Sequence, residues 1–134
     1  MASYNGTTAT NRLKAVRDQI DSKTWVDGSG AGSAGTLVLG TSSLSGATGV
    51  LATITLQNPA STVSGSVLTL AGLPLSTTAS AAGTLAKAEI RNNAGTAILT
   101  GLSVGTSASD IIVNTTTTTT GQTVTVTAAT ITHP

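Results

Sequence analysis

The sequence predicts a mainly β protein: an antiparallel β-sandwich, jelly-roll-like or immunoglobulin-like, with one short α-helix near the N-terminus. Three observations support this prediction. Short runs of alternating apolar and polar residues recur at roughly 8–12-residue intervals, and Gly, Asn or Pro separate them. Most charged residues, by contrast, gather before residue 28, where the apolar spacing is that of a helix. A small barrel is the related alternative. A β-helix or fibre would need a fixed repeat period, and the sequence has none.

The distribution of charge also sets the predicted domain boundaries. Residues 1–26 form an N-terminal arm with an amphipathic helix, residues 27–35 a Gly/Ser-rich linker, and residues 36–134 the β domain. The charged residues up to the linker are Arg12, Lys14, Arg17, Asp18, Asp21, Lys23 and Asp27, and those of the β domain are Lys87, Glu89, Arg91 and Asp110. With 134 residues, the chain is long enough to bury a core of its own.

The helix is predicted at about residues 10–22. Leu13, Val16 and Ile20 recur at the i, i+3 and i+7 positions, which gives one apolar stripe. A helix this short is marginal in water, so the stripe must dock on another surface. That surface is either the chain's own β domain or a neighbouring subunit. In the second case Leu13, Val16 and Ile20, together with Trp25, are the candidate contacts with a partner.

The charged side chains of this helix are expected to lie on its solvated or ion-paired face. Lys14 with Asp18, and Arg17 with Asp21, are four residues apart and face each other on a helix. Asp18 and Asp21 are about one turn apart, so a cation between them is the alternative. Calcium needs six or more oxygen ligands, which a helix surface seldom supplies, and no metal site is predicted.

A glycine-rich segment follows the helix. Trp25 precedes it and is either part of the domain core or an anchor on a partner. Residues Gly30–Gly35 fit the pattern G-x-G-x-x-G of dinucleotide-binding proteins, but that motif needs a strand before it and a helix after it. Here the predicted helix comes first and the apolar run Leu37–Leu39 follows. A flexible linker is therefore the preferred interpretation.

The β domain opens with two predicted strands that have a clear pattern. Residues 50–57 alternate between an apolar and a mixed face, and Asn58-Pro59 ends that run. Leu68 and Leu70 mark a further strand between two glycines.

The most secure hairpin is predicted after residue 85. In residues 86–91, three apolar residues alternate with three charged ones, so Glu89 is predicted to face solvent between two basic neighbours. Residues 92–95, Asn-Asn-Ala-Gly, tolerate positive φ and supply the turn. Residues 97–99 begin the return strand.

The C-terminal third contains two more predicted strands. The first covers residues 110–114, and six threonines follow from Thr115 to Thr120. The last strand begins with Val124 on its apolar face, but Ile131 lies on the opposite parity. One extra residue at Ala128-Ala129, a β-bulge, would restore the alternation.

Composition excludes several function classes. The chain has no Cys, so disulfides and thiolate metal sites are excluded. Six Lys and Arg against five Asp and Glu give a net charge of +1, and Trp25 and Tyr4 are the aromatic residues, so neither a basic patch nor a stacking platform for nucleic acid is predicted. No apolar run approaches the roughly 18 residues of a membrane helix, and the first residues do not fit a signal peptide.

No enzyme active site is predicted either. His133 is the one histidine, and it lacks His or Cys neighbours for zinc. Its position near residue 134 is also poor for a catalytic base. Five carboxylates leave little material for an acid/base pair. We therefore expect a protein without enzymatic activity and without a cofactor.

The sequence resembles short structural proteins encoded in the virion gene modules of tailed bacteriophages. The similarity spans most of the chain and involves no catalytic motif. Its segments are Thr10–Asp21 with the Gly/Ser spacer, Leu51–Leu56, Ala81–Thr84 leading into Ala88–Arg91, Gly121–Thr127 and Thr130–His133.

The resemblance implies a minor virion protein, made in the host cytoplasm and located on the phage head. A capsid decoration, or cement, protein fits best, and its partner would be the major capsid protein of the assembled lattice. A tail, connector or fibre component that binds the host surface is the alternative. The resemblance transfers no site residues.

Three rival functions remain from other classes. A glycan-binding module is disfavoured because no aromatic platform follows Trp25. A wall-degrading enzyme would need two carboxylates facing one cleft, and an adhesin fragment would need a secretion signal. For the chain itself we expect a homodimer or homotrimer, because Thr/Val strand edges without charge invite pairing.

Overall fold

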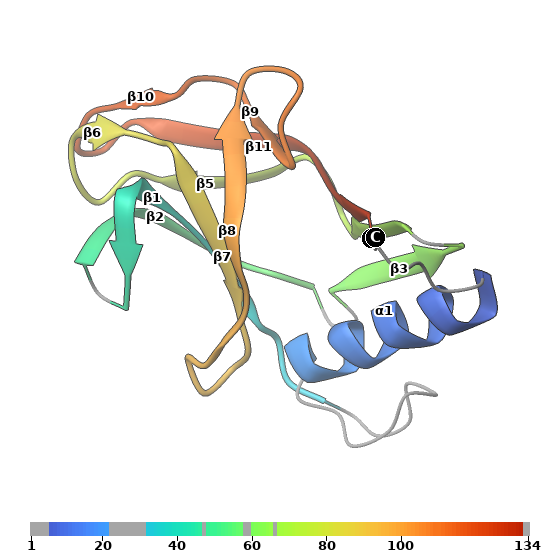
Figure 1. Cartoon of the computed structure of the whole chain (residues 1–134). Helices are drawn as coiled ribbons and strands as arrows, with labels where there is room; N and C mark the ends of the chain where they lie inside the picture. The colour runs from blue at the N-terminus through green and yellow to red at the C-terminus, as the bar shows by residue number, and fades with distance from the viewer. Residues whose placement is uncertain (1–5, 22–31, 47, 58–59, 66, 133–134) are drawn as a thin grey trace.

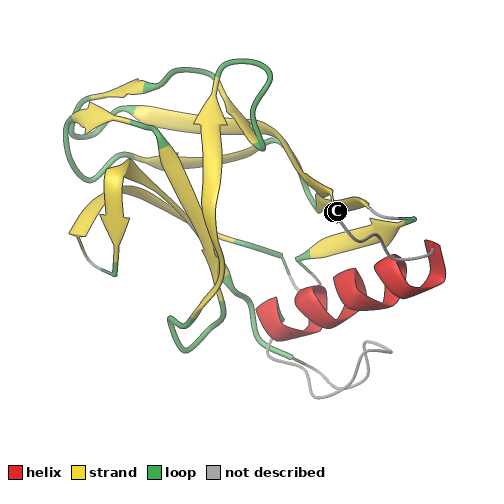
Figure 2. Ribbon diagram, viewed as in Figure 1, coloured by secondary structure: helices red, strands yellow, loops and turns green. Residues whose placement is uncertain are grey.

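The computed structural model describes residues 6–21, 32–46, 48–57, 60–65 and 67–132. It is mainly β with one helix near the N-terminus, as predicted (Figures 1 and 2). The helix α1 covers Gly6–Ile20. The strands are β1 (Thr36–Ser45), β2 (Thr48–Thr55), β3 (Ser61–Ser64), β4 (Val67–Leu70), β5 (Leu75–Thr78), β6 (Gly83–Thr84), β7 (Lys87–Arg91), β8 (Ala97–Gly105), β9 (Ile111–Val113), β10 (Thr117–Thr118) and β11 (Thr123–Thr132).

Hydrogen bonds join nine strands in one sheet. Eight of them follow the order β2-β1-β7-β8-β9-β11-β4-β3, and β5, off this path, pairs with β11. A sandwich consists of two stacked sheets. In this chain the strands named above form one continuous hydrogen-bonded sheet rather than two separate ones. The pairs are antiparallel except β8 and β9, which run parallel. Two reciprocal bonds hold the short connection between them: Ser103 N donates to Asp110 Oδ2 at 3.1 Å, and Asp110 N donates to Ser103 Oγ at 3.0 Å.

The path curls round so that its first strand, β2, lies beside β5, which pairs with β11. β5 and β4 pair with successive parts of the same edge of β11. β3 continues antiparallel beside β4, and β2 comes beside β5, where Ser80 N donates to Leu51 O at 2.8 Å. Ala71 N also donates to Ala60 O at 2.8 Å, which extends the pairing of β3 and β4 by one bond. The beginning of the path, β2, therefore lies close to β5, a partner of β11 further along the path.

The predicted hairpin of β7 and β8 is confirmed. Its turn closes through Gly95 N, which donates to Asn92 O at 3.0 Å, and Thr96 N, which donates to Asn92 Oδ1 at 3.0 Å. Gly95 has a φ of 87°, a value that favours glycine. Asn92 and Gly95 thus form the turn, as the sequence predicted.

The prediction that Glu89 faces solvent is wrong: this side chain is buried. Arg91 Nη2 lies 2.6 Å from Glu89 Oε1 and also donates to Gly46 O at 2.6 Å. Gly46 follows the end of β1, although β7 pairs with the beginning of that strand. The far end of the β1–β2 hairpin therefore folds back over β7. It covers a face that local alternation alone would leave exposed.

The predicted bulge in the last strand is also confirmed, and it falls just before the expected pair of alanines. The register between β11 and β9 shifts between Val126 and Ala128. Val124 and Val126 are buried before the shift, and Ala129 is buried after it. The extra residue, Thr127, keeps the apolar side chains inward along the whole strand.

The core of the described residues is aliphatic, apart from a few buried polar side chains. Thr118, in the middle of the threonine run, is one of them: its Oγ1 donates to Ala81 O at 3.1 Å and Gly83 O at 3.2 Å. The run is therefore not a uniform exposed tract, because one of its hydroxyls fastens β10 to the chain around β6.

The fold predicts different costs for one substitution at two neighbouring positions of β9. Ile111 is fully buried and Ile112 is half-buried. Ile111→Ala should lower the free energy of unfolding by about 3 kcal/mol, because it leaves a cavity. Ile112→Ala should cost about half of that or less. Urea titration of both variants tests this, and equal losses would contradict the assigned orientation of β9.

Candidate interaction surface

The apolar stripe of α1 docks on the chain's own β domain, which is the first of the two alternatives left by the sequence. Leu13 is 2% exposed and Ile20 is fully buried, and the helix contacts β3, β4 and β8 (Figure 1). This burial removes Leu13 and Ile20 from the candidate contacts with a partner. Val16 is half-buried against the core. Trp25 lies outside the described residues.

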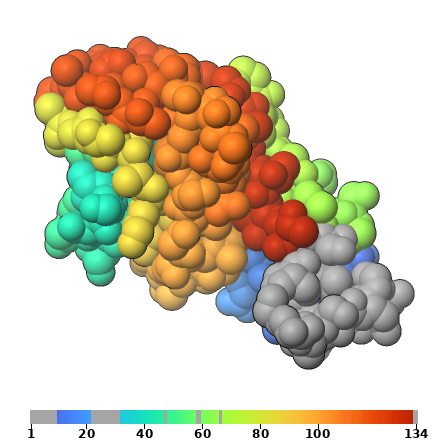
Figure 3. All heavy atoms as spheres, turned by 45° about the horizontal axis from the view of Figure 1, so that its top comes forward, coloured from blue at the N-terminus to red at the C-terminus, as the bar shows by residue number. Residues whose placement is uncertain are grey.

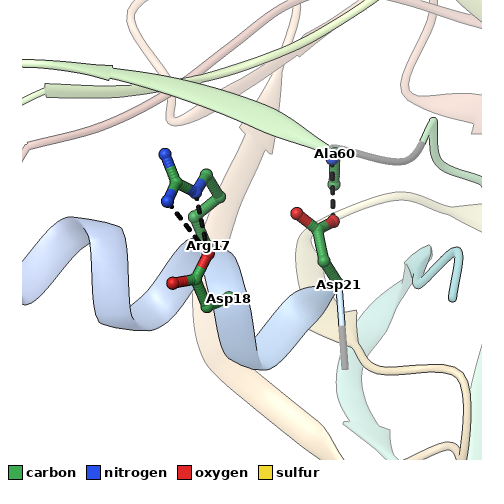
Figure 4. Close-up of polar contacts among 4 residues, drawn as sticks. All are labelled: Arg17, Asp18, Asp21 and Ala60. Atoms are coloured by element: carbon green, nitrogen blue, oxygen red, sulfur yellow. Dashed lines mark hydrogen bonds and ion pairs between the residues drawn. The ribbon is translucent and has the colours of Figure 1, made fainter. Parts of the chain in front are cut away.

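A buried carboxylate fastens the end of α1. Asp21 is fully buried rather than solvated, and its Oδ1 accepts a hydrogen bond from Ala60 N at 2.8 Å (Figure 4). The backbone of the same residue accepts from Ser33 N at 2.7 Å and donates to Arg17 O at 3.0 Å. One residue therefore joins the helix, the chain that enters β1 and the chain that enters β3.

Asp18 is buried beside it and forms an ion pair. Its Oδ1 lies 3.0 Å from Nη2 of the adjacent residue, Arg17 (Figure 4). Both side chains are largely buried, at 4% and 17% exposure for Asp18 and Arg17. The pairs with a spacing of four residues stay predictions. The described residues contain no group of three or more His, Cys, Asp or Glu that would hold a metal ion.

The last residues of the predicted linker are held by hydrogen bonds, whereas residues 27–31 lie outside the described part. Asn93 Nδ2 donates to Ala34 O at 3.1 Å, and Leu56 N donates to Gly35 O at 2.9 Å. A Cβ on Gly35 would lie 2.5 Å from Arg91 O. The glycine therefore lets the chain pass close to the backbone of β7 at Arg91 and to that of α1 at Ile20. The order of helix, glycines and strand is the reverse of a dinucleotide site, as the sequence suggested.

The outer face of β11 carries hydroxyl side chains along its length, and its neighbours extend them sideways. The register places Thr130 beside Thr69, and Thr69 beside Thr62. It also places Thr125 beside Ser76, and their hydroxyl oxygens are 3.0 Å apart. We call this surface the hydroxyl band. Its members are Thr62, Ser64, Thr69, Ser76, Thr78, Thr123, Thr125, Thr127, Thr130 and Thr132.

The hydroxyl band is exposed and carries no ionisable side chain. All its members are exposed except Thr69 and Thr125, which are half-buried, and Val67 lies among them, also half-buried. In Figure 3 the red atoms of the C-terminal strand lie beside the green atoms of β3 and β4. β11 has ten residues, so the band is about 33 Å long. Each hydroxyl both donates and accepts hydrogen bonds, so the surface fits a neutral, hydrogen-bonding partner.

Sequence reasoning found only part of this surface. The alternation of threonine and valine after residue 122 identified the last strand, and the bulge accounts for Thr130 and Thr132 remaining outward. The contributions of Ser76, Thr69 and Thr62 depend on pairing with strands far along the chain. The signal that was available is clear for Thr69, which lies between Leu68 and Leu70. It is weaker for Thr62 and Ser76, because each has only one apolar neighbour in its own strand.

The comparisons with known proteins give no relative. The chain matches no protein-family model, no curated protein and no solved structure. No helix among the described residues is long and apolar enough to cross a membrane. His133, for which no catalytic or metal-binding role is predicted, lies outside the described residues.

The buried carboxylate generates a prediction about stability. Asp21→Ala should lower the free energy of unfolding by about 2 kcal/mol, because it leaves Ala60 N–H buried without its acceptor. Asp21→Asn keeps an oxygen at that position and should cost clearly less. Urea unfolding followed by circular dichroism measures both. If the two variants were equally stable, the bond to Ala60 would not be what holds the helix end.

Proposed function

We propose that this chain is a non-enzymatic structural protein of a tailed-phage virion, and specifically a capsid decoration protein that binds the assembled major capsid lattice and stabilises the head. The resemblance of the sequence to phage virion proteins suggests this class. The observation that carries the proposal further is the hydroxyl band, a surface about 33 Å long without an ionisable group.

The band supports a role in assembly because of what soluble β proteins usually do with such surfaces. Charged side chains are the common protection of β surfaces against association. Ten Thr and Ser side chains take their place here, and the whole chain has only 8% charged residues against about 25% in an average soluble domain. A surface of this kind suits a protein that functions while neighbouring proteins cover this surface.

Stabilisation of the head would follow from linkage. A protein that binds the assembled shell, but not the free subunits, favours the shell by its binding free energy. Each contact can be weak, because many copies on one lattice act together. The packing of α1 on its own β domain fits this role, since a decoration protein must arrive at the finished shell as a folded unit.

The number of copies per particle tests this proposal. We expect purified virions of a phage that encodes this chain to contain it in a ratio near one to one with the major capsid protein, or in a simple fraction of that ratio, because a decoration protein occupies repeated lattice positions. Quantitative mass spectrometry with labelled peptides of both proteins measures the ratio, and the portal protein serves as the low-copy control.

A handful of copies per particle would contradict the decoration role and would move the chain to the tail or connector. Heating provides a second readout. Particles that lack the protein should release their DNA at a lower temperature than complete ones, and adding the purified protein back should restore the difference.

A further inference from the structure

We propose that the hydroxyl band binds a second copy of this chain, face to face about a two-fold axis. The inference deepens the proposed function, since a pair of copies joined in this way could hold two capsomers together. It can fail without the proposed function failing, because the pairing is a property of the purified protein.

The charge of the band favours a second copy as its occupant. A two-fold contact is formed by the same patch on both copies, so a patch with net charge repels itself. None of the ten band residues is ionisable. Exposed charges do occur elsewhere in the described chain, on Arg12, Lys87 and Asp110, but not in the band. When the bands of two copies face each other, no band residue of one copy therefore lies opposite a like charge in the band of the other.

The hydrogen-bonding chemistry of the band is self-complementary as well. A hydroxyl group donates one hydrogen bond and accepts others, so a row of threonines satisfies an identical row in either direction. The pair Ser76 Oγ and Thr125 Oγ1, 3.0 Å apart, is an example of this within one copy. A phosphate or an anionic membrane would find no cation here.

The size of the band determines how strong the pairing is. The band is about 33 Å long and two to three strands wide, with about 4.8 Å between strands, which gives on the order of 400 Å² per copy. A standard stable interface buries about 800 Å² per partner. We therefore expect a weak dimer whose population depends on concentration. On a shell surface the local concentration of copies is high, so a contact of this strength would be occupied there.

Sedimentation equilibrium over a concentration series from about ten micromolar to about one millimolar tests the pairing. The wild-type chain should shift from monomer to dimer within this range. Thr123→Lys with Thr130→Lys places two exposed charges in the band, and like charges across the contact should weaken the dimer at least about tenfold. The matched control is Thr84→Lys with Thr100→Lys, two exposed strand threonines outside the band, which should dimerise as the wild type does.

A charge reversal separates a specific contact from a general loss of association. The variant with Thr123→Asp and Thr130→Asp should also be monomeric alone, whereas an equimolar mixture with the Lys variant should form a heterodimer. Circular dichroism and urea midpoints check that all three double variants fold. A wild-type chain that stays monomeric at every concentration would overturn the proposal. So would a dimer that the band variants leave unchanged, because the contact would then lie on another surface.

Discussion

The buried carboxylate of Asp21 is the constraint on which the rest of the arrangement depends. A carboxylate without solvent exposure is costly unless hydrogen bonds compensate it, so its position restricts where its partners lie. Its bond to Ala60 N fixes the chain immediately before β3. With β3 placed, β4 follows through their shared register, and β4 in turn pairs with the end of β11. The exposed hydroxyls of three strands thus share one face because of a group at the end of the helix.

The bulge at Thr127 is the second condition for that surface. A strand of ten residues with strict alternation would carry Ile131 outward and Thr130 inward, given that Val124 is buried. The register shift reverses the parity after Val126. Ala129 is then buried, and Thr130 and Thr132 stay on the face that Thr123 and Thr125 occupy. Without the extra residue, the hydroxyl band would end halfway along β11, and an apolar side chain would take its place.

The features that could be predicted from the sequence depend on neighbours within a few residues. Examples are the turn at Asn92–Gly95, the helix around Leu13 and the parity change after Val126. Each of them follows from the spacing of residue types within a short segment. Glu89 could not be predicted, since its cover comes from residues that fold back from the end of β1. The parallel pairing of β8 and β9 and the burial of Asp21 are equally non-local. Only part of the band could be predicted. The threonines of β11 follow from local alternation, but the positions of Ser76, Thr69 and Thr62 beside them depend on pairing between strands far apart in the sequence.

The distribution of acidic groups links the fold to the proposed role. Three of the chain's five acidic side chains, Asp18, Asp21 and Glu89, are buried in structural contacts. Because three acids are buried, the exposed ionisable side chains among the described residues are few: Arg12, Lys87 and Asp110. Such a surface gives little electrostatic protection against association. Adding carboxylates to the strands would improve solubility, but in the proposed dimer it would also repel a second copy at the band. For the proposed role, the scarcity of surface charge is therefore a requirement rather than a defect.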